Sequence, residues 1–191
     1  MTTALPGADG VARCPWGNST VDYAAYHDEE WGVELRGEAA LYERLSLEAF
    51  QSGLSWLTIL RKRTAFRAAF AGFEPEKVAA FGPDDVERLM NDTSIVRNRA
   101  KIDATIRNAR AIAELDVPLD DLLWSFAPTG KRRRPRLTSD VPAITDESKA
   151  MAKALKKRGF AFVGPTTAYA LMQATGMVDD HLADCWRGSA P

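Results

Sequence analysis

The stretch LEAFQSGLSWLTILRKR, residues 47–63, holds the end of one helical pattern and the start of the next. Its apolar residues recur at intervals of three and four positions, which is the period of an amphipathic helix. Gly53 ends the first pattern, because glycine readily adopts the left-handed backbone that closes many helices. A second pattern begins at Ser55. The stretch therefore predicts two helices, at about 38–52 and 55–70, joined by a tight turn.

Helical periodicity continues on both sides of this stretch, and strand-like alternation is scarce. Ser19 is placed to cap a short helix that Gly32 ends, and Thr145 to cap a later one that Gly159 ends. Proline-rich and basic residues 128–142 form the best loop candidate. We expect an all-α fold with helices packed around a core. The remaining helices are expected at about 84–90, 95–115, 119–126, 145–158 and 166–176.

Length and composition indicate one soluble globular domain. The chain has 191 residues, of which 46% are hydrophobic and 27% charged. We expect a single domain over 1–191, with a core at about 13–185 and flexible tails at 1–12 and 186–191. No apolar run approaches the length of a membrane span, and no secretory signal precedes the first helix. These features predict a cytoplasmic protein, which we expect to be a monomer.

Charge alone argues weakly against a nucleic-acid partner, because the net charge is −1. The basic residues are nevertheless clustered, so the surface could still be polarised. For any single cluster, a solvated helix face is the favoured interpretation. The clusters are Arg61 to Arg63, then Arg97, Arg99 and Lys101, then Lys131 to Arg134 with Arg136, and finally Lys153, Lys156, Lys157 and Arg158.

All cysteines and histidines of the chain fall in two short windows, as Cys14 and His27, then His181 and Cys185. The second pair is spaced so that both side chains lie on one face of a helical turn. A Cys2His2 set is a common tetrahedral zinc site, and with four protein ligands it leaves no position for water. This pattern predicts one structural zinc ion that ties the two ends of the chain together. A disulfide between Cys14 and Cys185 is the alternative, although a cytoplasmic location disfavours it, and unrelated buried residues are a further one.

Aromatic residues gather in the first 56 positions, where core packing is their default explanation. Glu48 is less easily explained, because on a helical wheel it lies beside Leu41 and Leu45 at the edge of the apolar stripe. A carboxylate placed there should be partly buried, with a shifted pKa. Together with nearby Trp56 it would suit a flat polar ligand such as a nucleobase. A glutamate that reaches water from a helix boundary is the competing interpretation.

Longer motifs go beyond composition. The chain contains RCPW (13–16), YAAYHDEEWG (23–32), LEAFQSGLSWLTILRKR (47–63), FRAAF (66–70), IVRNRAKIDATIRNA (95–109), LLWSF (122–126), KALKKRGF (153–160), FVGPTTAYALMQATG (162–176) and VDDH (178–181). In these motifs the chain resembles the 3-methyladenine DNA glycosylase I family over roughly residues 13–185.

The resemblance implies a fold, a metal and a base pocket. It implies a helix-hairpin-helix DNA glycosylase fold with one structural zinc, whose ligands fall on the four residues found by spacing. The base-recognition carboxylate of the family falls on Glu48, and its stacking aromatic falls on Trp56. Further pocket aromatics fall on Trp16, Tyr23 and Tyr26.

The resemblance also implies a DNA-gripping hairpin near 93–99. The wider superfamily usually has a glycine-rich hairpin, whereas this chain has none there. We expect the hairpin and the start of the following helix to contact DNA phosphates through Ser94, Arg97, Asn98, Arg99 and Lys101.

The implied function is a monofunctional glycosylase that flips out and excises 3-methyladenine from double-stranded alkylated DNA. It would release the free base without cutting the strand. A non-catalytic module of the same fold that binds alkylated DNA is the main alternative. A zinc hydrolase would need an open metal position, which the fourth ligand Cys185 disfavours. A purely structural zinc protein is the last alternative.

Overall fold

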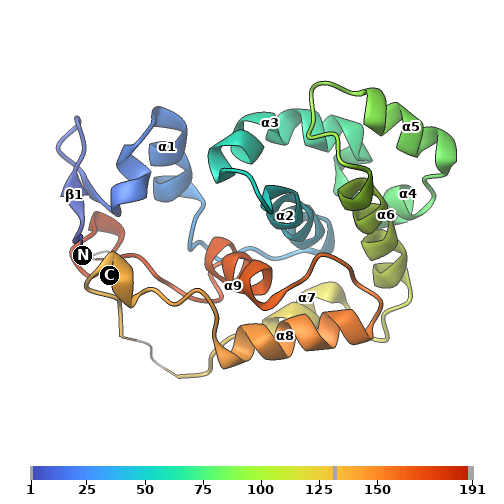
Figure 1. The fold of residues 1–191 in the computed structure, drawn as a ribbon. Coiled ribbons are helices and arrows are strands. Elements are labelled where there is room, and N and C mark those ends of the chain that lie inside the picture. The colour runs from blue at the N-terminus through green and yellow to red at the C-terminus, as the bar shows by residue number, and fades with distance from the viewer. Residues whose placement is uncertain (1, 131–132, 189–191) are drawn as a thin grey trace.

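The computed structural model describes residues 2–130 and 133–188, and these residues are mostly helical (Figure 1). The predicted all-α class is therefore confirmed as a mostly helical fold. The α-helices are α1 (Val21–Glu29), α2 (Glu38–Gln51), α3 (Trp56–Ala69), α4 (Pro75–Ala79), α5 (Pro83–Asn91), α6 (Arg99–Ala113), α7 (Leu119–Trp124), α8 (Asp146–Lys157) and α9 (Pro165–Ala174). The 3-10 helices are η1 (Pro15–Asn18), η2 (Ala71–Phe73), η3 (Thr138–Asp140) and η4 (Trp186–Gly188), and the strands are β1 (Leu5–Pro6) and β2 (Ala12–Arg13).

Helix α2 forms the centre of the core (Figure 1). It contacts α3, α4, α6, α7 and α9, and its side chains Leu41, Tyr42, Leu45 and Phe50 are fully buried. Burial of this apolar surface is the main force that holds the helices together. The Tyr42 hydroxyl donates to the backbone oxygen of Thr105 in α6 at 2.8 Å, so its polar end is satisfied inside the core. A residue on the inner side of α2 is consequently held rigidly.

Both ends of the described chain meet at one side of the molecule. β1 and β2 form an antiparallel hairpin, in which Leu5 pairs with Arg13. The amide of Ala4 donates to Asp184 at 3.0 Å, and the amide of Thr138 donates to the backbone oxygen of Thr2 at 3.0 Å. The indole N–H of Trp186 also donates to Asp28 at 2.9 Å, so both described ends make contacts with the rest of the fold, while the flexibility of the tails stays a prediction. Met1 and residues 189–191 lie outside the described part.

Helix boundaries differ from the sequence-based ones where a polar side chain caps the backbone. Thr20, not Ser19, caps α1 by accepting from the amide of Tyr23. Helix α6 begins at Arg99 rather than near 95, because the Asn98 side chain accepts from the amide of Lys101 and ends the preceding turn. The short helix α4 was not predicted. Within the described residues, none of the helices is both long and apolar enough to cross a membrane.

Candidate active site

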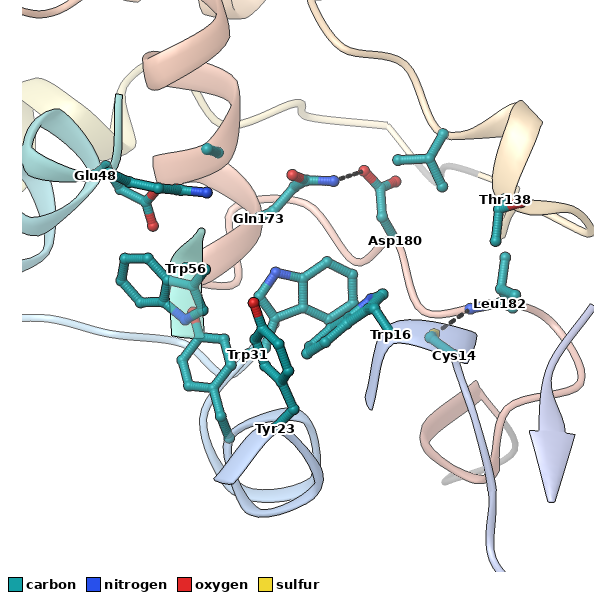
Figure 2. Close-up of a pocket in the computed structure, with 14 residues that line it drawn as sticks. Cys14, Trp16, Tyr23, Trp31, Glu48, Trp56, Thr138, Gln173, Asp180 and Leu182 are labelled. Atoms are coloured by element: carbon teal, nitrogen blue, oxygen red, sulfur yellow. Dashed lines mark hydrogen bonds between the residues drawn. The ribbon is translucent and has the colours of Figure 1, made fainter. Parts of the chain in front are cut away.

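A cavity of about 340 Å³ opens between α1, α2, α3 and α9 (Figure 2). The turn between α2 and α3 shapes one side of it. Gly53 supplies the left-handed backbone of this turn, with φ +81°, and Ser55 caps α3 by accepting from the amide of Thr58. The structure brings all five residues expected to recognise the base to this cavity. They are Trp16, Tyr23, Tyr26, Glu48 and Trp56.

Glu48 supplies a buried carboxylate to the cavity. Its side chain is only 6% exposed, and burial raises its pKa to about 7. The Arg44 guanidinium, one helical turn earlier on α2, acts in the opposite direction and favours the charged form. A pKa so far above that of an ordinary glutamate is uncommon away from a functional site.

Aromatic rings line the cavity around this carboxylate. The ring centroids of Tyr26 and Trp56 are 5.5 Å apart, and those of Trp16 and Tyr23 are 5.6 Å apart in an edge-to-face arrangement. Arg44 lies behind the first pair, at 5.4 Å from the Tyr26 ring and 5.6 Å from the Trp56 ring. Its Nη1 donates to the Tyr26 hydroxyl at 2.9 Å. The cavity thus offers flat apolar faces held in place by a buried cation.

Two polar groups on these rings have an unused hydrogen-bond donor. The Trp56 Nε1 is buried without a hydrogen-bond partner among the described residues. The Tyr23 hydroxyl accepts from the amide of Leu57 at 3.0 Å, at the start of α3, and so keeps its own proton to donate. A buried donor without a partner is costly, and a ligand acceptor would remove that cost.

Sequence reasoning missed several cavity residues. Trp31, Gln51, Gln173 and Asp180 also line the cavity, and Arg44 supports it from behind. Arg44 could have been found from its spacing of four residues before Glu48 on one helix face. Gln173 and Asp180 come from α9 and the segment after it, and only the tertiary fold brings them beside α2.

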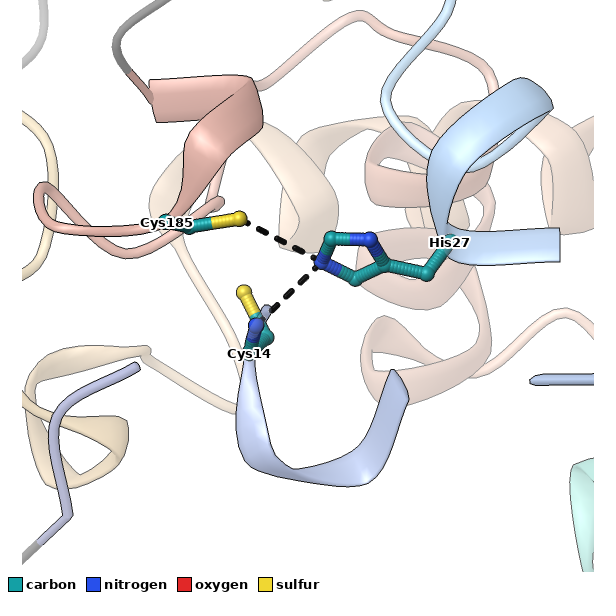
Figure 3. A group of neighbouring side chains, drawn as sticks. All are labelled: Cys14, His27 and Cys185. Atoms are coloured by element: carbon teal, nitrogen blue, oxygen red, sulfur yellow. Dashed lines mark hydrogen bonds between the residues drawn. The ribbon is translucent and has the colours of Figure 1, made fainter. Parts of the chain in front are cut away.

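Three of the four predicted metal ligands cluster next to the cavity (Figure 3). The Cys14 and Cys185 sulfurs and a nitrogen of His27 lie within 4.8 Å of one another, and all three residues are buried. His181 lies beside this group, with its ring centroid 4.9 Å from that of His27. The two cysteines are free thiols, so the alternative of a disulfide between them is not found.

The two histidines are oriented by carboxylates. The Nδ1 of His27 is 2.8 Å from Asp28, and the Nδ1 of His181 is 2.9 Å from Asp179. Each contact uses Nδ1 and leaves Nε2 for a metal, an arrangement typical of metal-bound histidines. In the structure the Nε2 of His27 accepts from the Cys14 amide at 3.4 Å and lies 3.5 Å from the Cys185 sulfur. Gly32 provides the space for this, because a Cβ there would lie 2.7 Å from the His181 ring and its φ is +77°.

The two cysteine thiols change each other's pKa. A hydrogen bond from Cys14, assisted by His27, lowers the pKa of Cys185 well below that of an ordinary thiol, and the same contact with burial raises the pKa of Cys14. Trp16 and Trp31 pack between this group and the cavity, and Cys14 and Leu182 line the cavity itself.

Comparison with known proteins identifies the family. Residues 16–188 match the family model described as methyladenine glycosylase. This chain belongs to the methyladenine glycosylase family.

Similar proteins in the family match over almost their whole length. The chain is 46% identical over 183 residues to DNA-3-methyladenine glycosylase 1 of Escherichia coli (strain K12). The aligned region covers 92% of this chain and 96% of that protein. It is 42% identical to the DNA-3-methyladenine glycosylase of Haemophilus influenzae, over 92% of this chain and 97% of that protein. A solved structure of 3-methyladenine DNA glycosylase I from Staphylococcus aureus, described as showing the basis of 3-methyladenine recognition, superposes with a TM-score of 0.87 at 36% identity and covers 94% of this chain and 97% of that chain.

In this methyladenine glycosylase family member, α5 and α6 are joined by a turn over residues 92–98. Asp92 accepts from both the amide and the hydroxyl of Ser94. Lys62 of α3 donates to the backbone oxygens of Thr93 and Ser94 and holds the turn from behind. Arg97 and Asn98 are exposed at the end of the turn, and Arg99 is exposed but paired with Glu87. These residues remain available to a partner at the surface.

Lys101 is a different case and corrects the expectation of a phosphate contact. Its side chain is buried, and its ammonium donates to the backbone oxygens of Phe50 at 2.8 Å and Ser52 at 2.5 Å. Burial lowers its pKa. Lys101 thus caps the end of α2 and ties α6 to the turn that carries the cavity. Lys131 and Arg132 of the third basic cluster lie outside the described residues.

Proposed function

We propose that this protein is a monofunctional DNA glycosylase that excises 3-methyladenine from alkylated double-stranded DNA. The family membership sets the class of reaction, and both the E. coli and the H. influenzae relatives bear the name of this enzyme. The observation that carries the proposal to this chain is the buried Glu48 carboxylate in a cavity walled by aromatic rings. The cavity is of the size of small-molecule sites, so a single extruded base fits the site.

Glu48 would recognise the base. Its carboxylate can accept hydrogen bonds from the exocyclic amine and from a ring N–H of the methylated purine. Such charge-assisted hydrogen bonds contribute roughly 1.5–3 kcal/mol each. The Tyr23 hydroxyl and the Trp56 N–H supply donors at the same cavity for ring acceptors of the base.

The aromatic rings would favour a cationic base. Methylation at N3 places a positive charge on adenine, and a cation on an aromatic face gains roughly 0.5–2 kcal/mol. The same charge weakens the glycosidic bond and makes the base a good leaving group, so little acid catalysis is needed. Among the described residues that line the cavity there is no lysine, which fits hydrolysis by water without strand cleavage.

The DNA would be gripped by α5, the turn 92–98 and α6, acting as a helix-hairpin-helix element. The exposed Ser94, Arg97 and Asn98 with the start of α6 would contact the phosphate backbone. Such contacts position the enzyme without reading sequence, which suits an enzyme that must find damage anywhere. We expect it to act as a monomer.

The cluster of Cys14, His27 and Cys185, with His181 beside it, would hold one structural zinc ion. The fit is supported by the donor set and by the Nε2 of His181, which is buried without a hydrogen-bond partner among the described residues. Coordination of a metal ion by this nitrogen would account for its missing hydrogen-bond partner. Bound zinc would tie segments 14–27 and 181–185 together, and with four protein ligands it would leave no position for water.

The alternative of a lesion-binding module without activity is decided by one experiment. The protein is incubated with DNA methylated by an alkylating agent, and the released bases are separated by chromatography. Release of free 3-methyladenine would support the glycosylase activity. Binding to the alkylated DNA without release of any base would favour the module.

A further inference from the structure

A hydrogen-bonded chain on the wall of the cavity has no part in the functions described above. Asp180 is only 4% exposed. Its Oδ2 accepts from the Tyr169 hydroxyl at 2.5 Å and from the Gln173 Nε2 at 3.0 Å. Tyr169 is itself buried in α9, so the Asp180 carboxylate is held by a fixed part of the core.

This chain determines which way the Gln173 amide points. An amide can normally rotate by half a turn and exchange its donor and acceptor ends. A carboxylate only accepts, so the amide nitrogen must face Asp180. Figure 2 shows the resulting arrangement, with the nitrogen of Gln173 turned to Asp180 and its oxygen on the side of Glu48. The cavity therefore presents the amide oxygen as an acceptor.

We propose that Gln173 is a specificity-determining residue and that Asp180 is the residue that positions it. This inference rests on the proposed function. With Glu48, the fixed oxygen of Gln173 gives this side of the cavity two acceptors. A purine with an exocyclic amine at position 6 satisfies them, whereas a purine with a carbonyl there brings acceptors face to face. A buried polar group left unpaired in this way discriminates strongly between otherwise similar ligands.

The test compares two free bases, 3-methyladenine and 3-methylhypoxanthine, which carry an amine and a carbonyl at position 6. Their affinities are measured by quenching of the fluorescence of the cavity tryptophans. The Gln173→Met variant keeps the length of the side chain but has no amide. The Asp180→Asn variant supplies an amide that can donate to Gln173, so that the Gln173 amide can reverse. In both variants we expect the preference for 3-methyladenine over 3-methylhypoxanthine to fall about tenfold, the value of one hydrogen bond.

Gln51→Met is the matched control, because Gln51 lines the same cavity. Nothing in the described part of the chain fixes its amide, which can turn to suit either base, so its loss should weaken both affinities alike. Melting curves and zinc content are measured for Asp180→Asn, because this residue precedes His181. If Asp180→Asn does not fold, Gln173→Met still decides the role of Gln173. An unchanged preference in Gln173→Met would overturn the inference, while release of 3-methyladenine by the unaltered enzyme would still uphold the proposed function.

Discussion

Under the proposed function the charge of Glu48 sets how tightly the cavity binds a base, and pH sets that charge. Burial raises the pKa of Glu48 from 4.5 to about 7. This rise in pKa corresponds to roughly 3 kcal/mol of free energy. This is the free energy by which the folded protein disfavours the ionised carboxylate.

The sign of the effect on stability follows from the raised pKa. Below about 4.5 the carboxyl group is protonated in both states, and it makes no difference to the free energy of unfolding. As pH rises toward 7, the unfolded chain ionises first, so the folded protein loses up to about 3 kcal/mol. The Glu48→Gln variant lacks this loss. Above pH 7 we expect it to melt on the order of 6–12 °C higher than the unaltered protein, with the gain absent near pH 4.

Base binding should change in the opposite direction. At pH 8 the Gln variant lacks a charge-assisted hydrogen bond, which lowers its affinity for free 3-methyladenine roughly 10- to 150-fold. At pH 5 most Glu48 is protonated in the free enzyme, so the two affinities should approach each other. Protonation of the base itself affects both proteins equally, so it cancels in the ratio of their two affinities. The assay is isothermal titration of both proteins at pH 5 and pH 8, paired with melting curves. An equal ratio at both pH values would show that the charge of Glu48 does not contribute to recognition.

Three further predictions concern the metal and the DNA face. Purified protein should contain about one zinc ion per chain, and the Cys14→Ser variant should lose the zinc and melt at a lower temperature. Excision per folded molecule should fall less than about threefold in this variant, because the closed site has no catalytic water. Well-folded protein without zinc on metal analysis would contradict this. Arg97→Gln with Arg99→Gln should reduce the slope of log affinity against log salt by about 1 to 2, measured by fluorescence anisotropy on DNA of several sequences; an unchanged slope would place the DNA face elsewhere. Lys101→Met should leave that slope unchanged and lower the free energy of unfolding by about 1–3 kcal/mol in urea titrations, because two buried carbonyls lose their donor. A reduced slope with an unchanged free energy of unfolding would instead place Lys101 on the DNA face.

Local patterns predicted most of the helices and the burial of Glu48, and the family resemblance predicted which aromatic residues would line the cavity. The turn at Gly53 and the break at Gly32 follow from the conformational freedom of glycine, so the sequence indicates them directly. The place of Glu48 beside Leu41 and Leu45 predicted burial, and the side chain is buried. The two Cys and His windows predicted a cluster, and three of the four residues form one.

Contacts between distant segments could not be predicted in this way. Lys101 has the same charge as Arg97, and only the approach of α6 to the end of α2 turns it into a cap for two carbonyls. The orientation of Gln173 likewise depends on a carboxylate seven residues later, which the turn after α9 brings back to the helix. Local periodicity carries no information on contacts between residues far apart in the sequence.

Release of free 3-methyladenine from methylated DNA tests the central claim most directly. Methylated duplex DNA is incubated with the unaltered enzyme and with Glu48→Gln at pH 8, and the released bases are quantified by chromatography. We predict that the unaltered enzyme releases 3-methyladenine and leaves the strand uncut, and that Glu48→Gln releases it more slowly although it folds. Equal release by the two proteins would remove Glu48 from the active site, and no release by the unaltered enzyme would contradict the proposed function.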